Sequence, residues 1–171
     1  LLMGTAVWNV LGLAPDLTIR GSAPAANPVP ENSYKTWASY AGDKLGNRYS
    51  SLADITPSNV DSLVAAWSYQ SGAFNNREHV KSNASFESTP ILVEDSLIFC
   101  TQFNEVIALE PDTGNEKWRY DPELKLDIRP ANRFTCRGVS YWKDADAASS
   151  QVCASRLFMG TADARLIALD A

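Results

Sequence analysis

The sequence predicts an all-β fold built from repeated antiparallel sheets, and two observations support this. Between residues 89 and 120, four short apolar segments alternate with tight turns. Part of this pattern returns later in the chain, where Leu157 takes the place of Leu97. Four short strands joined by tight turns form one antiparallel sheet, the unit of a propeller blade. We therefore expect a partial propeller, with one full blade-type unit and a second that the printed sequence ends partway through.

The first unit is expected to hold four strands, at residues 90–93, 97–101, 106–109 and 116–120. Its tightest turn is predicted at residues 111–114, where Gly114 can adopt a positive φ. Upstream, residues 54–64 predict a short helix or turn that Thr56 or Ser58 caps. Residues 65–69 predict a further strand that leads into the unit.

The repeat is carried by two segments that recur at the same spacing. Residues 97–99 align with 157–159, and residues 106–110 align with 166–170, both at one constant offset without a gap. Such units need neighbours to bury their faces, so isolated copies are marginal. An accidental match of two hairpins is the alternative explanation. A WD40 array is not expected, because the offset from Leu97 to Leu157 is longer than the WD40 period of about 40–45 residues.

Composition excludes some classes of function. The net charge is −5 and no basic run occurs, so we expect no nucleic-acid partner. An odd number of cysteines, Cys100, Cys136 and Cys153, rules out a fully paired disulfide framework. Either all three are buried free thiols, or Cys136 pairs with Cys153 in an oxidising compartment.

Residues 1–33 differ in composition from the rest of the chain. Residues 1–14 are mostly apolar but too few to span a bilayer, which takes about 20. They fit the apolar part of an export signal or the end of a membrane anchor; a buried element of the fold is the third alternative. A linker with three prolines follows at residues 22–32. We therefore expect a signal or anchor remnant plus linker at 1–33 and a folded domain at 34–171.

Several motifs, in the same order along the chain, resemble one family: the quinoprotein dehydrogenases that use pyrroloquinoline quinone (PQQ). They are W-A-S-Y-A-G and G-N-R-Y-S-S-L near the start, F-E-S-T-P, A-L-x-x-x-T-G-x-x-x-W, T-C-R-G-V-S-Y and D-A-R-L-I-A-L. The resemblance covers about residues 34–171. It implies the N-terminal part of an eight-bladed β-propeller whose four-stranded blades carry tryptophan-docking repeats.

The same motifs narrow the resemblance to a branch. Members that oxidise alcohols carry two adjacent cysteines before the R-G pair, whereas here only Cys136 stands there. The single cysteine in this motif is similar to the pattern of the branch that oxidises glucose, quinate and shikimate. The resemblance to this branch implies a sugar or polyol substrate and ubiquinone or another electron acceptor. It also implies a periplasmic enzyme, anchored to the inner membrane through its N-terminus. A quinoprotein alcohol dehydrogenase, favoured by Glu87, and a non-catalytic propeller scaffold are the alternatives.

The resemblance implies roles for three residues. Arg137 matches an arginine that binds PQQ, and its planar guanidinium suits the carboxylates of that cofactor. Glu87 stands where relatives that oxidise alcohols place a PQQ-contacting glutamate, and Thr161 lies near a PQQ-binding threonine. The cofactors implied are PQQ and Ca²⁺. The general base and the metal ligands are expected after Ala171, so we expect this chain alone neither to hold PQQ tightly nor to turn over substrate.

Overall fold

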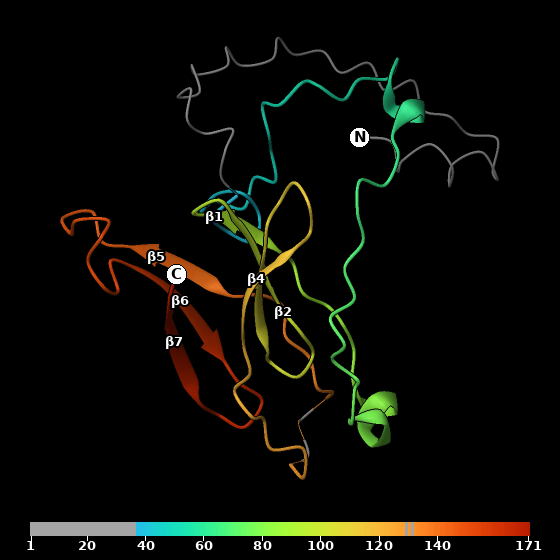
Figure 1. Cartoon of the computed structure of the whole chain (residues 1–171), viewed down its shortest axis with the longest axis vertical. Coiled ribbons are helices and arrows are strands. Elements are labelled where there is room, and N and C mark those ends of the chain that lie inside the picture. Colours follow the sequence, from blue (N-terminus) through green and yellow to red (C-terminus); the bar gives the residue numbers. More distant parts are fainter. Residues whose placement is uncertain (1–36, 129, 131) are drawn as a thin grey trace, which may run out of the picture.

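The computed structural model describes residues 37–128, 130 and 132–171, which form two antiparallel sheets (Figure 1). The first sheet has the order β1-β2-β3-β4, with strands Ile91–Val93, Ser96–Cys100, Val106–Leu109 and Glu116–Tyr120. The second has the order β5-β6-β7, with strands Ser140–Lys143, Ser155–Gly160 and Leu166–Asp170. The predicted all-β fold and the four strands of the first unit are confirmed. The predictions for residues 1–33 lie outside the described residues.

Within the described residues, two short 3-10 helices precede the first sheet: η3 at Val60–Ser62 and η4 at Glu78–Asn83. The first confirms the helical turn predicted within residues 54–64. The predicted cap is wrong: Asn59 precedes η3, and its side chain accepts a hydrogen bond from the Thr56 backbone N–H at 2.7 Å. In the part of the chain that the structure describes, no helix is both long and apolar enough for a membrane span.

The prediction of a strand at residues 65–69 is also wrong. This segment is extended but pairs with no described strand, and it contacts the first sheet through its side chains instead. The Trp67 indole Nε1 donates to the Pro111 carbonyl oxygen at 3.0 Å. Gly114 lies against the ring with a φ of +71°, and a Cβ there would come within 2.4 Å of the indole. The turn at 111–114 is therefore a docking site for a tryptophan that comes from outside the sheet.

The sequence repeat is preserved in the pairing of the strands. Ile98 pairs with Ala108 in the first sheet, and Phe158 pairs with Ala168 in the second. The turns between these strands match as well: the Thr101 N–H donates to the Glu105 carbonyl at 2.8 Å, as the Thr161 N–H does to the Arg165 carbonyl at 2.9 Å. The alignment therefore reflects a structural repeat and not an accidental match.

The two sheets share a core and are joined at both ends of the contact between them. Apolar side chains of both, among them Ile98, Val106 and Leu157, form one buried cluster. At one end the Asn104 side-chain oxygen accepts a hydrogen bond from the Ala162 N–H at 3.0 Å. At the other end Glu94 accepts hydrogen bonds from the second sheet. The sheets thus pack as neighbouring units.

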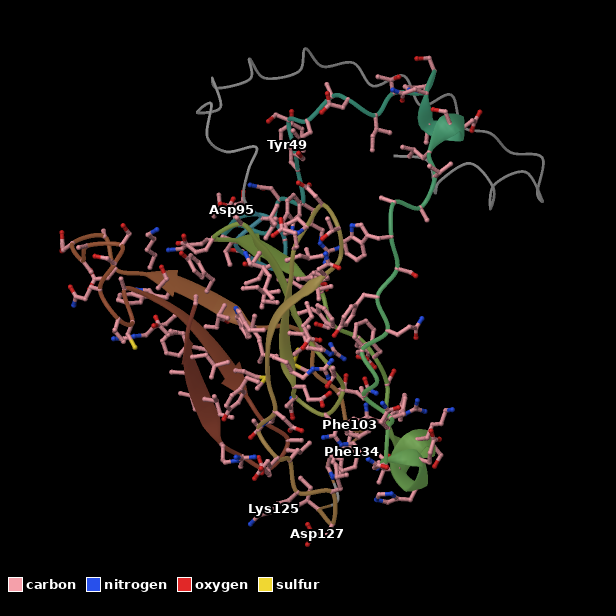
Figure 2. The ribbon with its side chains drawn as sticks, viewed as in Figure 1. Tyr49, Asp95, Phe103, Lys125, Asp127 and Phe134 are labelled. Atoms are coloured by element: carbon pink, nitrogen blue, oxygen red, sulfur yellow. A yellow bond between two sulfur atoms is a disulfide. The ribbon has the colours of Figure 1, made fainter. Side chains whose placement is uncertain are left out.

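A smaller aromatic core supports the loops below the first sheet. Phe103 and Phe134 lie side by side near η4 (Figure 2), with ring centroids 5.8 Å apart, and both are buried. Phe74 packs edge-on against Phe103, with centroids 5.6 Å apart. This cluster fixes the start of the 134–138 segment, which carries the T-C-R-G motif.

The cysteines differ from both expectations. Cys100 and Cys136 form a disulfide with their Cα atoms 5.9 Å apart, and Cys153 is the free thiol. Cys100 ends β2 and faces the shared core, where the 134–138 segment passes. Cys153 instead lies in the turn before β6, where its backbone N–H donates to Asp170. Position in the fold, and not proximity along the chain, decides the pairing.

Candidate functional site

Two of the motifs identified in the sequence lie side by side in the structure. Ala84 and Phe134 form a parallel bridge, and the Ser85 N–H donates to the Phe134 carbonyl at 3.0 Å. Further along, the Thr89 N–H donates to the Arg137 carbonyl at 3.0 Å. The F-E-S-T-P and T-C-R-G segments therefore run side by side next to the end of β2, with a shift of one residue between the two contacts.

This arrangement brings together two of the three predicted site residues. The Arg137 Nη2 lies 3.3 Å from the Glu87 Oε2, which makes an ion pair. The Arg137 side chain is 78% exposed and that of Glu87 is 37% exposed. A guanidinium carries five N–H donors in a planar fork. Among the described residues only Glu87 pairs with it, so its other donors can bind a second carboxylate bidentately.

The backbone next to Arg137 has features that suit the close approach of a ligand. Gly138 has a φ of +150°, a conformation open essentially only to glycine, and a Cβ there would lie 3.3 Å from the Thr89 carbonyl oxygen. The Thr135 hydroxyl is buried and has no hydrogen-bond partner among the described residues. Buried polar groups are nearly always satisfied, so an unpaired hydroxyl two residues from Arg137 indicates a missing partner.

The third predicted residue, Thr161, occupies a different setting. Its hydroxyl accepts from the Arg165 N–H at 3.0 Å and donates to Asp163. Arg165, followed by this hydroxyl, lowers the pKa of Asp163 to about 2. Thr101 makes the equivalent bond to the Glu105 N–H at 3.2 Å in the first sheet. Thr161 is therefore engaged within its own turn, and no hydrogen bond joins it to Arg137 or Glu87 within the described residues.

The described residues include no group of three His, Cys, Asp or Glu side chains placed to hold a metal ion. The polar groups at the site are a guanidinium that donates, a carboxylate that accepts, an unpaired hydroxyl and backbone groups. This set suits an anionic organic ligand. The Ca²⁺ implied by the family resemblance stays a prediction.

Comparison with known proteins decides the family. A family model described as the β-propeller domain of PQQ-using glucose/ethanol/alcohol dehydrogenases matches residues 37–171. The chain belongs to this family. The match begins at the first described residue and covers both sheets and both motifs of the site.

Individual relatives agree with this assignment. The chain is 38% identical over 149 residues to the glycerol dehydrogenase large subunit of Gluconobacter oxydans, covering 87% of this chain and 20% of the relative. It is 35% identical over 158 residues to the quinoprotein glucose dehydrogenase of Escherichia coli, covering 90% and 20%. The chain thus spans about a fifth of the length of the curated relatives it matches.

A solved quinoprotein shows the same arrangement of strands. The quinohemoprotein alcohol dehydrogenase of Comamonas testosteroni superposes with a TM-score of 0.61 at 30% identity, covering 80% of this chain and 18% of that one. The names of these three relatives include glycerol, glucose and alcohol dehydrogenases. The family is therefore established, whereas these relatives differ in the substrate that their names give.

Sequence reasoning missed three features of the site: the Cys100–Cys136 disulfide, the unpaired Thr135 hydroxyl, and Ser88, whose hydroxyl accepts a hydrogen bond from the Cys100 N–H at 3.1 Å. Thr135 and Ser88 stand inside motifs already singled out, so their positions were available as a signal. The disulfide joins two cysteines with a sequence separation of 36, so only the folded structure shows that they are close enough to bond.

Proposed function

We propose that the full-length protein is a PQQ-dependent dehydrogenase that oxidises a sugar or cyclitol hydroxyl, glucose-like in class, and passes electrons to a quinone acceptor. In this proposal the chain supplies part of one wall of the cofactor pocket through Arg137 and Glu87. One observation carries it: the exposed Arg137 guanidinium is held beside Glu87 by paired backbone segments, with most of its donors free.

PQQ fits this donor set. It carries three carboxylates and an ortho-quinone, so its pocket needs cationic donors and directed hydrogen bonds. Arg137 would bind a carboxylate of the cofactor, Glu87 would hold the guanidinium in place, and the Thr135 hydroxyl would supply a further hydrogen bond. When bound, PQQ accepts the hydride equivalent, with Ca²⁺ polarising its quinone. Thr161 remains a candidate contact that would have to exchange its present partners.

Two observations support the glucose-type branch and export. The T-C-R-G segment contains Cys136 alone, without the adjacent cysteine typical of alcohol-oxidising members. The Cys100–Cys136 disulfide indicates an oxidising compartment such as the periplasm. We extend the proposal to residues 1–33, as an export signal or the remnant of an inner-membrane anchor, and to ubiquinone as acceptor. Residues 34–171 are then the N-terminal part of the propeller domain.

Substitution of Arg137 in the full-length protein tests the proposal. We expect Arg137→Ala to weaken PQQ binding about 10- to 100-fold in a fluorescence titration, as for loss of a charge-assisted hydrogen-bonded pair. The matched control is Arg156→Ala, because Arg156 stacks on Trp142 in the second sheet, away from Glu87. Wild-type affinity in Arg137→Ala would contradict the proposal and favour a non-catalytic scaffold.

A quinoprotein alcohol dehydrogenase is the second candidate, and Glu87 is the observation that favours it. A substrate panel on the PQQ-loaded enzyme separates the two. We expect the kcat/KM for glucose or quinate to exceed that for ethanol and other simple alcohols. The reverse order would place the protein in the alcohol-oxidising branch while leaving the role of Arg137 intact.

A further inference from the structure

The Cys100–Cys136 disulfide is placed directly behind the proposed cofactor arginine. Cys136 precedes Arg137 in the chain, and Cys100 is the last residue of β2. Both cysteines are buried, with Cys136 6% exposed and Cys100 0% exposed. Since β2 pairs with β1 on one side and β3 on the other, the disulfide attaches the arginine to a strand that is fixed on both edges.

Two hydrogen bonds complete a closed ring around this attachment. The Cys100 N–H donates to the Ser88 hydroxyl at 3.1 Å, and the Thr89 N–H donates to the Arg137 carbonyl at 3.0 Å. Ser88 and Thr89 are adjacent, as are Cys136 and Arg137. The ring therefore holds both segments of the site, and Glu87 stands immediately before Ser88.

Among the described residues the Arg137 side chain has only one partner, Glu87, and this ion pair alone holds it weakly. The side chain is 78% exposed, so packing does not hold it, and its ion pair with Glu87 is solvated. It lies on the long connection between β4 and β5, which runs from Asp121 to Val139. Cross-linking restricts the conformations of such a connection. A binding group must be held to a fraction of an ångström for full effect.

We infer that Cys100 and Cys136 are positioning residues for Arg137: their disulfide holds the arginine in the place where it meets the carboxylate of an anionic cofactor. This inference rests on the proposed function. It assigns to the disulfide an effect on ligand affinity beyond any effect on the stability of the fold. Ser88 contributes to the same positioning, because its hydroxyl accepts a hydrogen bond from the Cys100 N–H.

The test compares Cys100→Ala/Cys136→Ala with the matched control Cys153→Ala in the full-length protein. We expect PQQ affinity to fall about tenfold or more in the first variant, by analogy with the loss seen when groups that orient metal-ligating side chains are removed. Hydrogen exchange should accelerate in residues 121–139, while β2 and β3 keep their protection. The Cys153→Ala variant should match wild type in both measurements, because Cys153 is a free thiol.

A double-mutant cycle with Arg137→Ala separates positioning from general stability. We expect removal of the disulfide to cost almost no further PQQ affinity once Arg137 is gone, because both changes act on one contact. Additive losses, or a folded disulfide-free protein with affinity within about twofold of wild type, would overturn the inference. Unchanged affinity in Arg137→Ala alone would instead reject the proposed function.

A second variant covers the case in which the disulfide-free protein does not fold. Ser88→Ala keeps the disulfide and removes one hydrogen bond of the ring. We expect PQQ affinity to fall about threefold, the size of one ordinary hydrogen bond, without loss of folding. Wild-type PQQ affinity in a folded Ser88→Ala variant would contradict the role of the disulfide and its hydrogen bonds in positioning Arg137.

Discussion

Strands β3 and β7 occupy the same place in the repeat, yet they have different surroundings. Their sequences are V-I-A-L and L-I-A-L-D, and both pair with the preceding strand in the same register. All four residues of β3 are buried, whereas β7 alternates between exposed and half-buried, and Leu166 is 76% exposed. An almost identical strand is therefore a core element in one sheet and a surface element in the other.

The difference comes from what lies on each side of the strand. Val106 and Ala108 of β3 face the core shared with the second sheet. Ile107 and Leu109 face Trp67 and Tyr69, from the segment that precedes the first sheet. Among the described residues β7 is paired on one edge only. Burial in this fold is thus given by neighbouring units and not by the strand's own sequence.

Loss of the tryptophan dock should have the largest effect on the first sheet. Gly114→Ala would place a Cβ within 2.4 Å of the Trp67 ring at a φ of +71°. We expect unfolding of the first unit to become easier by about 4 kcal/mol, from the left-handed backbone and overpacking together. Chemical denaturation of the full-length protein, followed by tryptophan fluorescence, measures the change.

A glycine of the second sheet that faces open space serves as the control. A Cβ at Gly160, at the end of β6, would meet no atom within 4 Å. Gly160→Ala should leave the denaturation midpoint unchanged or raise it slightly. Equal losses at both glycines would show that the two sheets are equally packed, against the comparison above.

The turns after β2 and β6 carry charged residues at equivalent positions, and these residues differ in burial. Glu105 is almost fully buried; its carboxylate meets Arg77 at 2.9 Å and the Thr101 hydroxyl at 2.9 Å. Glu105→Ala should cost about 2 kcal/mol of folding free energy, because Arg77 loses one of its two ion pairs, keeping that with Asp121, and the Thr101 hydroxyl loses its acceptor. The denaturation midpoint measures this loss.

The equivalent residue in the second copy of the repeat is Arg165, whose guanidinium is 44% exposed although its partner Asp163 is only 7% exposed. We expect Arg165→Ala to lower the denaturation midpoint less than Glu105→Ala does, because solvent screens the exposed guanidinium and the Asp163 carboxylate keeps the Thr161 hydroxyl as a hydrogen-bond donor. A large effect at Arg165 together with a small one at Glu105 would reverse the assignment of core and surface turns.

A smaller loss than at Gly114 or Glu105 is expected where the two sheets are joined by Glu94. Hydrogen bonds from Lys143, at 2.8 Å, and from Tyr141 hold the pKa of the Glu94 carboxyl below its ordinary value of 4.5. A lowered pKa in the folded state means that the contact stabilises the fold above pH 4.5 and is lost as the pH falls through the folded-state pKa.

Glu94→Gln should therefore lower stability at pH 7 by less than about 1 kcal/mol, because more than a third of the Glu94 side chain is exposed and solvent screens the pair. The gap between variant and wild type should close as the pH falls below the folded-state pKa. Urea denaturation at pH 7 and at successively lower pH values measures it. A gap that widens on acidification would contradict the role given to Glu94.

The sequence predicted the elements whose signals are local. Strands β1 to β4 follow from apolar segments between turns, and the repeat follows from a fixed spacing. The failures involve partners far along the chain: residues 65–69 are extended without a described strand to pair with, and Cys100 bonds to Cys136 and not Cys136 to Cys153. For the site, family motifs marked Arg137 and Glu87, but only the fold shows that they meet.

The dock that holds Trp67 also has a consequence for synthesis. The tryptophan leaves the ribosome well before Pro111 and Gly114, the residues that receive it, a delay of about 2–10 seconds at ordinary translation rates. During this interval the indole ring of Trp67 has no surface to pack against. It can dock only after the turn at residues 111–114, which follows β3, has been synthesised. The chain is therefore expected to need protection from aggregation while it is still growing.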